Sequence, residues 1–151
     1  MYVFITVTGA NDAPSAGSDG TGAVTEDAST TTATGSITAT DDDDAAAFTY
    51  SGDATGTYGS IAVDSAGAWT YTLDNSDADT TALDAGDTVT EQYTITVTDD
   101  GTGTLSDTMT VTVTITGADD DVSAGADQTG AVTEDASTTT ATGTVAATDD
   151  D

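Results

Sequence analysis

The chain has 151 residues and a formal net charge of −28, which comes from 28 acidic residues with no Lys, Arg, His or Cys. Nucleic acid and direct membrane contact are excluded because no side chain can neutralise phosphate, and zinc, copper and haem sites are excluded because they need His or Cys. Two carboxylates about 4 Å apart repel by roughly 4 kcal/mol at an effective dielectric near 20, so a compact state with clustered Asp needs bound cations or high salt.

The sequence repeats itself at an offset of 108 residues. Residues 8–43 and 116–151 are identical at 28 of 36 positions, and the apolar alternation of Met1–Val7 returns in Met109–Ile115. A long internal period indicates an array of similar units, and one period suits a single small domain. We therefore expect residues 1–9 to be the last strand of a preceding repeat, residues 10–117 to be one complete repeat, and residues 118–151 to be a linker and the first strands of the next repeat.

Short β-branched segments separated by turn residues predict an all-β unit. Trp69 and Tyr71 share one face of a predicted strand and are strong core candidates, as are Ile95 and Val97 in a later strand. Seven strands in about 100 residues are typical of a Greek-key β-sandwich. In chain order they are predicted at Ala23–Thr25, Ala33–Thr40, Phe48–Ser51, Tyr58–Val63, Ala68–Leu73, Val89–Thr98 and Leu105–Thr116.

Acidic residues gather where the predicted strands end. Glu26 follows the first strand, Asp41–Asp44 follow the second, and Asp99 and Asp100 precede the last. Calcium takes roughly six to eight oxygen ligands and tolerates irregular geometry, whereas magnesium prefers a stricter octahedral shell. No EF-hand loop or Gly-rich nonapeptide occurs in the sequence, so a calcium site would be assembled from separate strands. The alternative is a solvated acidic surface adapted to saline water.

Three segments of the unit resemble the VCBS-type repeat of giant bacterial surface adhesins. They are Gly56–Asn75, Leu83–Gly101 and Ile115–Asp120, and the resemblance covers essentially the whole unit. The unit is also similar to cadherin-type domains more broadly. The resemblance implies a cadherin-like or Ig-like β-sandwich in a tandem array, within a secreted, extracellular protein of adhesion, biofilm or cell-surface structure. It also implies Ca²⁺ as the cofactor and neighbouring repeats of the same chain as partners.

The resemblance further implies metal ligands at matching positions. The cadherin acidic residue near the end of the first strand matches Glu26, and the Leu-Asp-x-Glu segment resembles Leu83-Asp84, with Gly86 where Glu is expected. In cadherin-like arrays each junction is built from both neighbours. The implied leading junction contains Asn11, Asp12, Asp41, Asp43 and Asp99, where Asp100 is an alternative to Asp99. The implied trailing junction contains Glu26, Asp84, Asp119, Asp120, Asp149 and Asp151.

Three non-catalytic functions are compatible with the sequence. The unit could be a spacer that calcium stiffens, or a subunit of a self-assembling extracellular filament or surface layer with lateral contacts through Met1–Thr8. It could also bind ice or carbohydrate through threonine ladders such as Thr110–Thr116, although Thr is simply a good outward strand residue. We do not expect an enzyme, because a Ser nucleophile would lack its base and no cationic side chain could orient a substrate.

Overall fold

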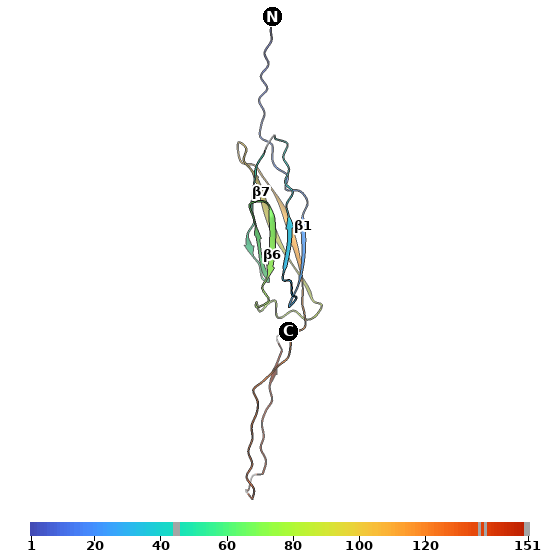
Figure 1. The fold of residues 1–151 in the computed structure, drawn as a ribbon, viewed down its shortest axis with the longest axis vertical. Coiled ribbons are helices and arrows are strands. Elements are labelled where there is room, and N and C mark those ends of the chain that lie inside the picture. The colour runs from blue at the N-terminus through green and yellow to red at the C-terminus, as the bar shows by residue number, and fades with distance from the viewer. Residues whose placement is uncertain (44–45, 136, 138, 150–151) are drawn as a thin grey trace.

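The computed structural model describes residues 1–43, 46–135, 137 and 139–149. Two four-stranded sheets pack face to face, and the described residues contain no helix. Figure 1 shows a long molecule in which the N-terminal tail leaves one end of this sandwich and a C-terminal hairpin leaves the other. The predicted all-β sandwich is therefore confirmed. No helix in the described part of the chain is long and apolar enough to cross a membrane.

The first sheet has the strand order β1-β8-β7-β3, and the second has the order β2-β6-β5-β4. β1 pairs with β8 in parallel, whereas every other pair in the two sheets is antiparallel. The first strand of the unit thus lies beside its last strand. The bounds are Gly20–Thr25 (β1), Thr32–Ser36 (β2), Phe48–Ser51 (β3), Ala54–Thr55 (β4), Gly59–Val63 (β5), Ala68–Leu73 (β6), Thr88–Asp99 (β7) and Ser106–Thr116 (β8).

Each of the seven predicted strands has a counterpart among these eight. The additional strand is β4, which has only two residues and pairs with β5. β2 ends at Ser36 and not at Thr40, although Thr40 forms an isolated bridge with Ser15 farther along. Periodicity did not predict β4 because two residues cannot display an alternation.

The core lies between the two sheets and follows the alternation of the strands. On the inward face of β7 and β8, the side chains of Ile95, Val97, Val111 and Val113 are 0 % exposed. Tyr71 on β6 meets them from the other sheet and is also fully buried. Burying a side chain of this size stabilises the fold by roughly 1.5–3 kcal/mol. The core therefore depends on a few long strands in which every second residue is apolar.

Trp69 is the large side chain of this core and requires small neighbours. A Cβ atom at Gly35 would overlap the indole ring, and one at Gly22 would lie 3.4 Å from it. Trp69 itself is 2 % exposed. The glycines on β1 and β2 therefore make the space that the indole fills.

The outward face of the first sheet carries hydroxyl groups in cross-strand rows. The pairing aligns Thr21 with Thr112 and Thr112 with Gln92, and the Gln92 side chain donates a hydrogen bond to Thr112 Oγ1 at 3.3 Å. The outward positions of β1, β3, β7 and β8 are Thr, Ser, Ala or Gln and include no carboxylate. The acidic residues are thus kept off this face and concentrate in the loops and at the two ends of the sandwich.

The C-terminal hairpin has the arrangement of the start of the unit. β9 (Ser123–Ala124) pairs antiparallel with β10 (Ala147–Thr148), and Thr148 lies opposite Ser123. At an offset of 108 residues this bridge corresponds to the bridge between Ser15 and Thr40. The repeat in sequence is therefore accompanied by a repeat in backbone pairing.

Candidate cation sites at the two ends of the sandwich

The leading end, where the N-terminal tail enters, gathers three distant segments. Asn11 Nδ2 donates to Asp99 Oδ2 at 2.8 Å, and the backbone N–H of Asp12 donates to Asp43 Oδ2 at 2.8 Å. The N–H of Asp43 in turn donates to Asp41 Oδ1 at 2.9 Å. The five residues predicted for the leading junction thus form two hydrogen-bonded groups, Asn11 with Asp99, and Asp12 with Asp43 and Asp41.

Asp99 is held at the end of β7 by the loop that follows. Its Oδ1 accepts the N–H of Leu105 at 2.9 Å, and the residue is 5 % exposed. A side chain at Gly101 would collide with the Asn11 amide, so this glycine leaves room for the linker. Asp100 instead binds the N–H of Ala47 at 3.0 Å. Of the two candidates, Asp99 is therefore the one that contacts the linker.

The leading end has a donor set that fits a hard cation. Asp41 Oδ2 is buried and has no hydrogen-bond partner, and a buried polar atom in that state needs an explanation such as an ion. The surrounding side chains offer carboxylate and amide oxygens, which calcium prefers. In the described residues no group of three acidic side chains is already arranged to hold a metal ion. Several of these oxygens accept N–H bonds instead, so metal binding would exchange those bonds for coordination.

The trailing end, where the chain leaves β8, gathers a second group. The Glu26 carboxylate accepts the N–H of Ala118 at 3.2 Å and is 2 % exposed. A Cβ at Gly117 would lie 2.6 Å from the carbonyl oxygen of Asp84, so the loop that carries Asp84 packs against the exit from β8. Glu26 and the loop that carries Asp84 are therefore both near the start of the linker.

The other predicted trailing residues lie in the linker and the hairpin. Asp119 and Asp120 follow Ala118 directly. Asp149 follows Thr148, which pairs with Ser123 just after the linker. Asp151 is outside the described residues. The hairpin thus returns Asp149 toward the linker, much as Asp41 lies near Asp12 at the leading end.

Sequence reasoning missed the role of Glu91, which links the two sheets. Its Oε1 accepts the N–H of Thr57 at 2.6 Å and of Tyr58 at 3.1 Å. Its Oε2 accepts the hydroxyls of Tyr71 at 2.7 Å and Tyr93 at 2.8 Å. Burial, followed by the hydrogen bond to Glu91, raises the pKa of both tyrosines far above the usual value. One signal was available, because Glu91 stands between Val89 and Tyr93 on the inward face of its strand.

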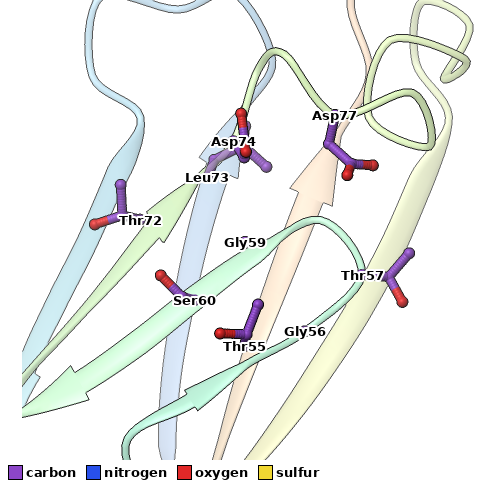
Figure 2. Close-up of a pocket in the computed structure, with 9 residues that line it drawn as sticks. All are labelled: Thr55, Gly56, Thr57, Gly59, Ser60, Thr72, Leu73, Asp74 and Asp77. Carbon is purple, nitrogen blue, oxygen red and sulfur yellow. The ribbon is translucent and has the colours of Figure 1, made fainter.

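A shallow pocket of about 420 Å³ lies beside the second sheet. Figure 2 shows Thr55, Ser60 and Thr72 along its strands and Asp74 and Asp77 on the loop beyond β6. Asp74 Oδ1 accepts hydrogen bonds from the Ser76 N–H and hydroxyl, which lowers the pKa of Asp74, and Asp77 Oδ1 accepts the Asp79 N–H at 2.9 Å. Both carboxylates thus stabilise their own turns, and the lining offers no nucleophile paired with a base.

The fold and its acidic ends define a β-sandwich domain of the cadherin-like class. The profile described as "Bacterial cadherin-like domain" matches residues 11–117, and the chain belongs to this family. Cadherin-like domains are generally non-catalytic, extracellular structural domains of the adhesion type, and they typically bind calcium. No curated protein sequence matches the chain.

Two solved structures share the fold. Mouse cadherin-23 EC22-24 is 22 % identical with a TM-score of 0.51, over 93 % of this chain and 45 % of that chain. Human CDH23 EC21-23 is 21 % identical with a TM-score of 0.50, over 91 % of this chain and 44 % of that chain. The chain therefore spans less than half the length of either structure. At this level of identity the likeness shows the fold alone.

Proposed function

We propose that the chain is a VCBS-type structural repeat of a secreted bacterial adhesin, in which calcium at the ends of each unit stiffens a tandem array. The observation that carries the proposal is the leading end, where the linker contacts both the β2–β3 connection and the end of β7, and where Asp41 Oδ2 is buried without a hydrogen-bond partner. An array of this kind would hold a distal binding or anchoring domain away from the cell surface.

The residues that would hold calcium lie on both sides of each junction. Asn11, Asp12, Asp41, Asp43 and Asp99 would form the leading site, and Glu26, Asp84, Asp119, Asp120, Asp149 and Asp151 would form the trailing site. When bound, the ion would supply positive charge and coordination that crosses the junction. Carboxylates of the chain accept hydrogen bonds from the linker and hold it against the strand ends. A bound cation would balance the negative charge of these carboxylates.

Electrostatics supports an external cation. A chain with no Lys, Arg or His has no internal side-chain counter-charge for 28 carboxylates. Repulsion at a junction would splay neighbouring units unless a bound cation or concentrated salt offsets it. A divalent ion that contacts both units would remove the repulsion and also fix the angle between them.

The proposal is tested by small-angle X-ray scattering of residues 1–151 with millimolar calcium and with chelator at matched ionic strength. We expect calcium to straighten the linkers at both ends and to increase the maximum dimension. Asp41→Asn combined with Asp43→Asn should abolish the change at the leading end. Asp79→Asn with Asp77→Asn makes the same change of charge in the loop between β6 and β7, outside the leading end, and should leave that change intact. Equal dimensions with calcium and with chelator would remove the proposed mechanism.

The carboxylate-free face of the first sheet favours a second candidate function. Its outward Thr and Ser rows are spaced by the strand separation of about 4.8 Å, so they form a regular hydroxyl array. Such an array could bind a crystalline surface such as ice or a polysaccharide. An ice-recrystallisation assay and a glycan array test this function, with Thr112→Asp as the disrupting variant. Activity that is absent in both assays would rule it out.

A further inference from the structure

Residues 15–19, the crossing segment, connect the linker of the leading end to β1 and are bound to β8 by two side-chain hydrogen bonds. The N–H of Ala16 donates to Asp107 Oδ2 at 2.9 Å, and the N–H of Thr110 donates to Asp19 Oδ1 at 2.8 Å. Each bond joins residues 91 positions apart, which is also the offset at which β1 pairs with β8. The crossing segment therefore continues the parallel register of β1, with carboxylates in place of backbone carbonyls.

The crossing segment has a fixed backbone path. Ser15 forms a backbone bridge with Thr40, and the chain then turns toward β8. At the turn Gly17 has φ of 80°, a left-handed conformation that favours glycine, and a Cβ atom there would lie 2.9 Å from the Thr38 carbonyl oxygen. Ala16 is 1 % exposed and belongs to the core. The segment is thus an anchored part of the sandwich.

This anchor lies directly after the linker residues of the leading end. Asn11 contacts Asp99 at the end of β7, and Asp12 contacts Asp43 in the β2–β3 connection. The linker can make both contacts only from one position. The crossing segment restricts that position, because each residue of the chain between them spans at most about 3.3–3.6 Å.

The two bonds to β8 differ in kind from metal coordination. Each joins a carboxylate directly to a backbone N–H, so neither needs a metal ion. The hydrogen bond from Ala16, followed by one from Thr108, lowers the pKa of Asp107, which keeps this acceptor ionised at neutral pH. The chain has no Lys, Arg or His that could compete for the two carboxylates. Neither Asp19 nor Asp107 is among the residues expected to hold calcium.

We propose that Asp19 and Asp107 are positioning residues that bind the crossing segment to β8 without metal and thereby hold Asn11 and Asp12 where the leading cation site forms. The inference rests on the proposed function and deepens it, because it names residues that preorganise the site without coordinating the ion. A site whose linker is already in place binds its ion more tightly than one in which binding must first order the linker.

The test is amide hydrogen exchange and calcium titration of residues 1–151, both followed residue by residue by NMR. In chelator we expect slow exchange of the Ala16 amide. Asp107→Ala should accelerate that exchange and weaken calcium binding, read from the Asn11 and Asp12 signals, by about tenfold, the lower end of what a hydrogen bond to a charged group contributes. The Glu26 signal at the trailing end should keep its wild-type response.

Asp107→Asn separates position from charge, because it removes the negative charge and retains an acceptor oxygen. It should keep the Ala16 amide protected and preserve most of the calcium affinity. Asp79→Ala removes a carboxylate from the loop between β6 and β7 and should behave like the wild type. Asp19→Ala and Asp19→Asn form a second pair, read from the Thr110 amide, in case Asp107→Ala does not fold.

Two results would overturn the positioning role. One is exchange of the Ala16 amide in chelator that is as fast in the wild type as in Asp107→Ala. The other is calcium binding at the leading end that Asp107→Asn weakens as much as Asp107→Ala, since charge alone would then explain the effect. A wild-type chain with a protected Ala16 amide and no calcium response at the leading end would instead overturn the proposed function and leave the anchoring of the crossing segment intact.

Discussion

At the residue scale, Glu91 shows how one carboxylate can stabilise a thin-cored domain. It accepts two backbone N–H groups from the segment before β5 and two tyrosine hydroxyls from β6 and β7. These donors belong to both sheets, so the side chain connects the two sheets. Hydrogen bonds to a charged group each contribute about 1.5–3 kcal/mol.

Glu91→Ala should therefore destabilise the fold by roughly 3 kcal/mol, because it leaves the Tyr71 and Tyr93 hydroxyls and two N–H groups without their acceptor. Gln92→Ala, one residue along the same strand and facing outward, is the matched control and should change stability by less than about 0.5 kcal/mol. Urea unfolding followed by tryptophan fluorescence measures both. Equal midpoints for the two variants would show that the Glu91 contacts contribute nothing.

The same two tyrosines predict a loss of stability in alkali. Their pKa values are raised in the folded chain, so both stay protonated while the unfolded chain loses these protons above pH of about 10. Their contribution is fully present below that pH, and stability should fall above it by about 1.4 kcal/mol per pH unit for each tyrosine. Thermal melts from pH 9 to 11 test this prediction, and Tyr71→Phe should halve the loss of stability per pH unit. A melting temperature that does not change in this range would contradict it.

At the element scale, the inward alternation of β6, β7 and β8 determines the core, and sequence reasoning predicted it. Trp69, Tyr71, Ile95 and Val97 were all placed inward and are all buried. The pairing of β1 with β8 could not be predicted, because it joins residues more than 80 positions apart with no local signal. At the two ends of the sandwich, the family resemblance suggested which residues take part. Their individual contacts, such as that of Asn11 with Asp99, could not be predicted and are seen only in the folded structure.

The glycines beside Trp69 offer a comparison within one chain. Gly35→Ala should destabilise the unit by about 1–3 kcal/mol, because the new Cβ overlaps the indole ring and the strand must shift. Gly143 is the corresponding residue in the hairpin. A Cβ atom added there would lie no closer than 3.9 Å to any neighbouring atom, so Gly143→Ala should leave the melting temperature unchanged. Thermal unfolding of both variants is the measurement. An equal effect at both positions would mean that contact with Trp69 is not the cause.

At the scale of the whole molecule, the sandwich keeps its acidic residues at its ends and off the broad face of the first sheet. The leading end joins the linker to Asp43 and Asp99, and the trailing end joins Glu26 to the exit from β8. In the proposed array the two ends would be complementary halves of a junction, and the net charge would make each junction depend on cations. The hydroxyl rows and the lining of the pocket in Figure 2 include none of the residues proposed for the two junctions.

The most direct test of this account is a thermal melt of residues 1–151 with millimolar calcium, with equal magnesium and with chelator, at matched ionic strength. We predict stabilisation that is specific to calcium, reaching about 2.7 kcal/mol at a free concentration 100 times the dissociation constant. The combination of Asp41→Asn and Asp43→Asn should reduce it, and the combination of Asp77→Asn and Asp79→Asn should not. Identical melts in all three solutions would contradict the account and would make the acidic ends a salt-adapted surface.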